Sequence, residues 1–152
     1  MKKKQKNIWK KGRGKLGLLS PLIGSWVAQT VSPMGNLTCT REFKPVLGGN
    51  YIQLTVRWDF EKFSYEEYAI IGVKEDLLHF WSFTSDGKNS EGKLTDGTDI
   101  HPEAICFEAE MPAGTARMLY WPNEEVGFNW AVESKNKKGW KRFTEHTYSA
   151  IK

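Results

Sequence analysis

The last predicted strand carries the side chains in this sequence that are best suited to chemistry. Its alternating positions place Arg142, His146 and Tyr148 on one face. A guanidinium, an imidazole and a phenol together donate and accept hydrogen bonds, which suits the polar end of a small molecule in a cavity. The alternative is that Arg142 and His146 face solvent, while Phe143 on the opposite face belongs to the core.

Three further residues are candidates for the same binding site. Arg57, in the third predicted strand, would meet an anionic group of a ligand inside the barrel; alternatively it is exposed or pairs with an acid on a neighbouring strand. Phe128 and Trp130, in the ninth predicted strand, would form part of an apolar cavity wall. Ordinary core packing of these two rings is the alternative.

The sequence contains no motif of a known catalytic machinery. Nucleophile elbows, phosphate-binding loops, dinucleotide fingerprints and metalloprotease helices are absent, so we assign no catalytic residue. Cys39 and Cys106 are too few for a disulfide framework, and no cysteine–histidine cluster predicts a metal site. A reduced, cytoplasmic chain is the simplest interpretation, because no run approaches the ~20 apolar residues of a membrane span.

The positive charge of the chain is concentrated at its beginning. Residues 1–15 hold eight of the 22 basic side chains and no acid, so the rest carries 14 basic and 18 acidic side chains. We therefore predict a disordered basic tail over 1–15 and a folded domain over 16–152. This distribution argues against a domain-wide basic surface, and we expect no specific nucleic-acid partner. Weak contact of the tail with an anionic surface remains open.

The pattern after residue 25 predicts an all-β fold. Short runs rich in β-branched and aromatic residues alternate with turn clusters, and no segment keeps a helical period. A compact apolar stretch over 16–24 predicts one short helix. The predicted strands cover residues 26–31, 37–46, 50–59, 65–73, 77–84, 88–95, 104–111, 115–121, 127–134 and 139–149.

Short connections make neighbouring strands antiparallel. Gly48-Gly49, Asp86-Gly87 and Asp96-Gly97 are typical of hairpins. Ten such strands hide their edges best by closing into an up-and-down barrel, and ten strands leave room for an internal cavity. A β-sandwich is the alternative, but it usually needs longer crossings.

The segment Leu22-Ile23-Gly24-Ser25-Trp26 precedes the first strand, and its Gly-x-Trp resembles the calycin superfamily of lipocalins, fatty-acid-binding proteins and nitrobindin-like proteins. The Leu47-Gly48-Gly49 hairpin is similar to that of uncharacterised bacterial lipocalin-like domains. The resemblance implies a ten-stranded barrel whose closed end is plugged by Trp26 beneath a short N-terminal helical segment.

The resemblance also bears on the last strand. Fatty-acid-binding proteins hold a ligand carboxylate with an arginine and a tyrosine two residues apart, and the matching positions here are His146 and Tyr148. A histidine is mostly neutral at pH 7, so this departure weakens the case for carboxylate binding. Nitrobindin-like proteins ligate haem through a histidine near the C-terminus, but Val27-Ala28-Gln29-Thr30 lacks their further glycines.

The leading hypothesis is reversible binding of a small, largely apolar molecule in the barrel. Trp26, Phe128 and Trp130 would line the cavity, and Arg142, His146 and Tyr148 would orient the polar end. A small acid–base enzyme or a haem protein on the same barrel is the alternative. A third is an adaptor that binds nucleic acid or membranes through its tail and the lysines of the last hairpin.

Overall fold

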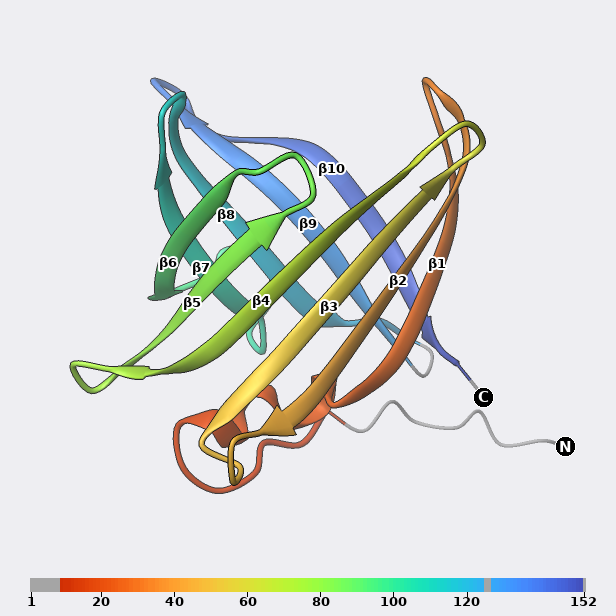
Figure 1. Ribbon diagram of the computed structural model, residues 1–152. Coiled ribbons are helices and arrows are strands. Elements are labelled where there is room, and N and C mark those ends of the chain that lie inside the picture. Colours follow the sequence, from red (N-terminus) through yellow and green to blue (C-terminus); the bar gives the residue numbers. More distant parts are fainter. Residues whose placement is uncertain (1–8, 125–126, 152) are drawn as a thin grey trace, which may run out of the picture.

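Ten antiparallel strands close into one barrel in the computed structural model, which describes residues 9–124 and 127–151 (Figure 1). Each strand pairs with its neighbours in sequence, and β1 pairs with β10. The predicted up-and-down barrel is thereby confirmed. The strands are β1 (Gly24–Ser32), β2 (Gly35–Val46), β3 (Tyr51–Phe60), β4 (Ser64–Lys74), β5 (Leu77–Thr84), β6 (Asn89–Thr95), β7 (Ile105–Met111), β8 (Gly114–Pro122), β9 (Gly127–Asn136) and β10 (Gly139–Ala150).

Tight turns set the register of the strands. Glu75 and Asp76 both take positive φ and join β4 to β5 as a two-residue hairpin. The β2–β3 turn also takes positive φ, at Gly48 (73°) and Gly49 (81°). Leu47 joins them in that region, so this loop spans four residues, two more than a hairpin turn made of Gly48-Gly49 alone. The extra residues do not shift the alternation of the flanking strands.

The helical segment closes one end of the barrel. It forms the 3-10 helix η1 (Leu16–Leu22), whose Leu19 and Leu22 are fully buried. The ring nitrogen of Trp26 donates to the carbonyl of Leu22 over 2.8 Å, which fixes the helix against the first strand. Burying each leucine contributes about 2 kcal/mol. The position agrees with the predicted place of the helix, and Trp26 lies directly beneath it.

Residues before the helix are only partly described. Residues 1–8, the larger part of the predicted basic tail, lie outside the described residues. Trp9 packs against the core, and Lys15 pairs with Asp76 in the β4–β5 turn. The division of the chain at residue 15 stays a prediction. No helix within residues 9–124 and 127–151 has both the length and the apolar character to cross a bilayer.

Large side chains fill the interior of the barrel. An enclosed cavity near the closed end measures about 10 Å³, which is about the space of one water molecule. Its walls include Leu19, Phe43, Glu67 and Tyr120. The ten strands were expected to leave a roomier cavity. Here the rings of bulky inward-facing residues meet across the middle of the barrel and occupy that volume.

The seam between the first and last strands is the weakest ladder. Only Trp26↔Ala150 and Val27↔Ser149 are paired there, whereas β1 and β2 pair over nine residues. One further bond, from the Ile151 N–H to the Ser25 carbonyl, extends the seam toward the closed end. From Ala28 to its end, β1 forms backbone pairs with β2 but not with β10. The barrel is therefore held closed on this side near its plugged end.

Candidate functional site

A buried arginine lies at the centre of the barrel. Arg41 follows Leu37 and Cys39 on the inward face of β2, and it is 1% exposed. Its Nε donates to the hydroxyl of Tyr148 over 3.0 Å, and its Nη1 donates to the hydroxyl of Tyr120 over 2.9 Å. β2, β8 and β10 thus contribute one polar group each to a single cluster.

An aromatic ring covers the same guanidinium. The Arg41 Cζ lies 4.3 Å from the ring centre of Trp130, a distance at which a cation is attracted by the ring face. The rings of Tyr120 and Tyr148 lie 5.7 Å and 5.4 Å away. We name these four residues, together with His146, the interior cluster.

The charge of Arg41 has no carboxylate partner. Within the described residues, no acidic oxygen lies within 4.0 Å of its guanidinium, and its Nη2 is buried without a hydrogen bond. Half-buried Glu67 attracts it only from a distance. Burying a charge costs free energy unless an opposite charge compensates it. An unpaired donor on a buried cation is thus the feature of this site that folding alone does not explain.

The two tyrosines remain neutral hydrogen-bonding groups. Burial raises the pKa of Tyr120 and of Tyr148 above their ordinary values, although the nearby Arg41 charge opposes the shift. Tyr148 also bonds the thiol of Cys39, and burial raises the pKa of that thiol to about 11. A protonated, buried thiol is a poor nucleophile. The cluster therefore offers hydrogen bonds and one positive charge rather than a nucleophile.

His146 lies next to the arginine on the side of the open end. Its ring is 5.1 Å from that of Trp130 and 5.4 Å from that of Trp58, between centroids. Burial, helped by the charge of Arg41, lowers its pKa to about 4, so the ring is neutral at pH 7. Its Nδ1 is buried without a partner. A second polar atom of the interior cluster is thus free to bond.

Most of the residues predicted from the sequence face the interior. Trp26, Phe128, Trp130, His146 and Tyr148 are all buried there. The rings of Phe128 and Tyr148 stack at 5.0 Å, and Trp26 meets Phe128 edge-on at 5.0 Å. The structure therefore brings these five side chains together in the interior, in a stack of aromatic rings that begins at the closed end.

Arg57 lies outside the barrel. It alternates with buried Val56 on β3, and its side chain is half exposed. It pairs with Asp59 over 2.8 Å and with Glu66 over 2.7 Å. The structure thus corrects its predicted inward position, in favour of the alternative that it pairs with an acid on a neighbouring strand.

Arg142 also lies outside, because β10 contains a bulge. The register with β9 shifts between Arg142 and Thr144, so Phe143 is an extra residue and the alternation changes face there. His146 and Tyr148 point inward, whereas Arg142 bonds Glu133 over 2.9 Å and Glu145 on the outer surface. Its predicted contact with the polar end of an interior ligand does not fit this position.

A second buried arginine lies on the outer face of β8. Arg117 is 4% exposed and donates to Glu133 over 2.8 Å and to both oxygens of Asp99. Asp99 belongs to the β6–β7 loop, which this bond ties to the sheet. The ring of Trp140 covers the guanidinium at 4.4 Å. Every group of this outer cluster has a partner, which is typical of a structural ion-pair network.

The surroundings of His146 do not fit a haem in this conformation. Trp58 and Trp130 lie against the ring, and the enclosed cavity below holds only about 10 Å³. Among the described residues, no group of three or more histidine, cysteine, aspartate or glutamate side chains is arranged to hold a metal ion.

Sequence reasoning missed Arg41 and Tyr120. A signal for Arg41 was present, because the alternation Leu37, Cys39, Arg41, Phe43 places a charge in the middle of an otherwise apolar face. Tyr120 lies in the eighth predicted strand, and nothing in its local sequence gives it a role. Their meeting across the barrel depends on the closed topology, which no local pattern contains.

No protein-family model matches the chain, and no curated protein sequence matches it either. A closed, ten-stranded antiparallel barrel with one short helix is consistent with a calycin-like fold.

Proposed function

We propose that this protein reversibly binds a small, largely apolar molecule that carries an anionic or strongly hydrogen-bond-accepting group, such as a carboxylate. The observation that supports the proposal is the unpaired Nη2 of the buried Arg41. A carboxylate placed there would compensate the buried charge and accept from the free donor. The Nδ1 of His146 would meet a further polar atom of the ligand.

The rest of the interior suits the apolar part of such a ligand. Phe128 and Trp130 are buried beside the cluster, and Trp58 is half-buried on the side of the open end. Apolar walls with few convergent polar groups are typical of small-molecule sites. These contacts support a binding role, because the walls are apolar and the polar groups of the interior cluster are hydrogen-bond donors and acceptors.

Binding requires the aromatic layer to move. The enclosed space of about 10 Å³ admits a single water molecule, so a larger ligand would displace a side chain. Trp58 is the ring best placed to move, because it is partly exposed and packs on Trp130 and His146 from the opposite wall. Swinging it toward the open end would uncover His146 first and Arg41 behind it.

The test uses a matched pair of probes, decanoate and decanol, titrated against tryptophan fluorescence. We expect decanoate to bind and to perturb the emission of Trp58 and Trp130. Arg41→Met should weaken decanoate binding by about 10- to 100-fold, the range for a hydrogen bond to a charged group. The same substitution should change decanol binding far less.

Arg57→Met is the control, because it removes an exposed arginine on the outer surface. It should leave both titrations unchanged. Equal loss of decanoate binding in both variants, or failure of every carboxylate tried, would contradict the proposal. Native mass spectrometry of protein purified from its host would then show which other class of molecule co-purifies.

Two finer assignments accompany this proposal. Membership of the calycin superfamily is supported by the barrel, the short helix and the position of Trp26 beneath it. A reducing, cytoplasmic location is supported by Cys39 and Cys106, both of which are free and buried.

A further inference from the structure

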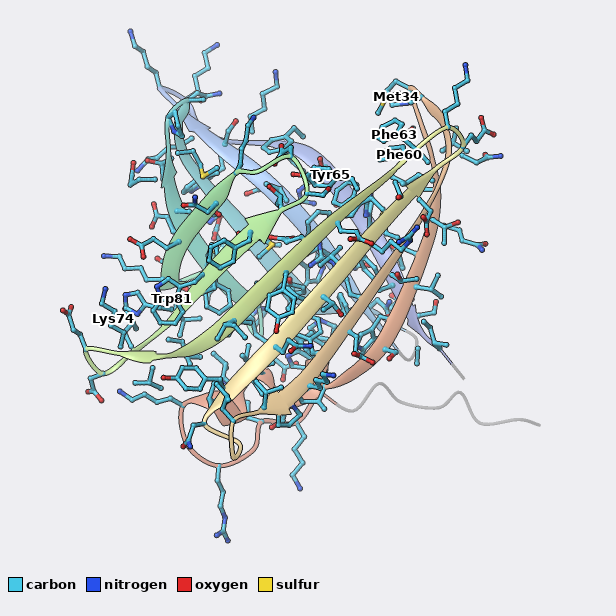
Figure 2. All side chains as sticks on the ribbon, viewed as in Figure 1. Met34, Phe60, Phe63, Tyr65, Lys74 and Trp81 are labelled. Carbon is cyan, nitrogen blue, oxygen red and sulfur yellow. The ribbon has the colours of Figure 1, made fainter. Side chains whose placement is uncertain are left out.

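Exposed apolar side chains gather at one part of the open end of the barrel. Val31 is 77% exposed, Met34 57% and Phe63 50%. Val31 lies near the end of β1, Met34 in the turn after it and Phe63 in the β3–β4 turn. The two turns lie close together, since Glu61 approaches Gly35. Figure 2 shows Met34 and Phe63 at the tips of these hairpins, above Phe60. We name Val31, Met34 and Phe63 the rim patch.

Lysines surround the same open end. The turns after β1, β3, β5, β7 and β9 all lie there (Figure 1). They contain four lysines and two acids: Lys62, Lys88, Lys137, Lys138, Glu61 and Asp86. The carboxylate of Asp86 accepts hydrogen bonds from the hydroxyl of Thr84 and from the backbone N–H of Lys88. None of these lysines has an acidic oxygen of a described residue within 4.0 Å, although Asp86 attracts Lys88 from farther away.

We propose that the open end of the barrel docks on an anionic lipid surface, with the rim patch inserted among the acyl chains and the turn lysines against the headgroups. Apolar tips beside unpaired cations are the combination that binds such a surface. The inference builds on the proposed function, because a docked open end would exchange an apolar ligand with the bilayer.

The shape of the patch favours a lipid surface over a protein partner. Met34 and Phe63 lie at the tips of turns (Figure 2), and the lysine-bearing turns reach the same end of the barrel (Figure 1). A deformable, anionic layer can meet separate tips at once. A protein interface would instead need a continuous, well-packed apolar centre.

The test is flotation of the full chain with vesicles made of equal parts of phosphatidylcholine and phosphatidylglycerol. We expect binding, which is weaker on pure phosphatidylcholine. Met34→Ser combined with Phe63→Ser should reduce binding roughly tenfold, because two exposed apolar side chains lose their contact with the acyl region. Each of Lys137→Gln and Lys138→Gln should reduce it about fivefold.

Leu47→Asn and Val73→Ser provide the matched control, since both remove exposed apolar residues near the turns of the opposite, closed end. This pair should bind vesicles as the unchanged protein does. Arg41→Met should also bind normally, so loss of decanoate binding and loss of docking are separable. Circular dichroism of each variant verifies that it is folded.

Three outcomes would overturn the docking proposal. Binding that survives the rim substitutions but disappears when Lys2, Lys3 and Lys4 are replaced would assign lipid contact to the tail. Absence of vesicle binding by the unchanged protein would remove it altogether. A dimer in size-exclusion chromatography that the rim substitutions dissociate, without vesicle binding, would assign the patch to contact between copies of the chain.

Discussion

The two buried arginines of this barrel have opposite surroundings. Arg117, on the outer face, bonds Glu133 and Asp99, so its charge is compensated twice. Arg41, on the inner face, bonds two tyrosine hydroxyls and keeps one nitrogen unpaired. Burial alone therefore does not distinguish a structural arginine from a binding one. The difference lies in whether the protein itself supplies the counter-charge.

The largest expected effect is on the outer cluster. Glu133→Gln removes the buried partner of Arg117 and should lower the free energy of unfolding by about 3 kcal/mol, measured by urea denaturation. Glu145→Gln is the control, because Glu145 also pairs with Arg142 but is half exposed; it should cost less than about 1 kcal/mol. Equal, small losses would show that the outer cluster does not stabilise the fold.

The next effect is a pH dependence of the inner cluster. The folded-state pKa of His146 is about 4, below its ordinary value of 6.5, so the unfolded chain binds a proton more readily. The contribution of neutral His146 to the free energy of unfolding is therefore complete above about pH 6.5, and it is lost as the pH falls toward 4. The loss should amount to about 2–3 kcal/mol.

His146→Gln isolates this dependence from that of the carboxylates. The stability difference between the unchanged protein and the variant should shrink or reverse between pH 7 and pH 4.5. In Arg41→Met the pKa of His146, followed by NMR, should rise because one cause of its depression is gone. A His146 that titrates near 6.5 in the folded protein would show that the interior is open to water.

A smaller effect is expected when the inner arginine itself is replaced. Arg41→Met removes a buried charge and two hydrogen bonds, and these changes oppose each other. The free energy of unfolding should therefore change by less than about 1 kcal/mol, in contrast to Glu133→Gln. A loss of several kcal/mol would place Arg41 in the same structural class as Arg117.

The smallest effect concerns the loop that covers the outer arginine. The hydrogen bond from Arg117 lowers the pKa of Asp99 below its ordinary value. The ionised carboxylate therefore stabilises the fold when the pH is above that ordinary pKa, and this stabilisation is lost as acid protonates Asp99. Its side chain is 54% exposed, so Asp99→Asn should cost only a few tenths of a kcal/mol, ~0.5 at most. Hydrogen exchange in the β6–β7 loop should nevertheless become faster.

The sequence was sufficient for the architecture because the strands and turns carry local signals. In the third strand, Ile52, Leu54 and Val56 alternate with more polar residues and are buried, so neighbouring positions alone predict the strand and its inner face. The hairpin turns are likewise predicted from a few adjacent residues. The short connections then leave antiparallel pairing as the simplest arrangement. Closure of ten such strands follows from the need to hide their edges.

The candidate site was harder to predict because it depends on features that are not local. One extra residue at Phe143 changes the face of β10, so Arg142 leaves the interior while His146 stays. Likewise, Arg41 finds Tyr120 and Tyr148 only across the closed barrel. The size of the cavity depends on how large rings interdigitate, which alternation does not determine.

The short ladder between β1 and β10 bears on how the chain reaches its folded state. Trp26 and Ala150 lie on the first and last strands, so their pairing closes a loop that spans nearly the whole barrel, and such contacts form late. Until the last strand is synthesised, the aromatic interior has one missing wall and two unpaired edges. An incomplete barrel of this kind exposes apolar surface and unpaired edges that favour aggregation, and this exposure ends when the two residue pairs of the seam form.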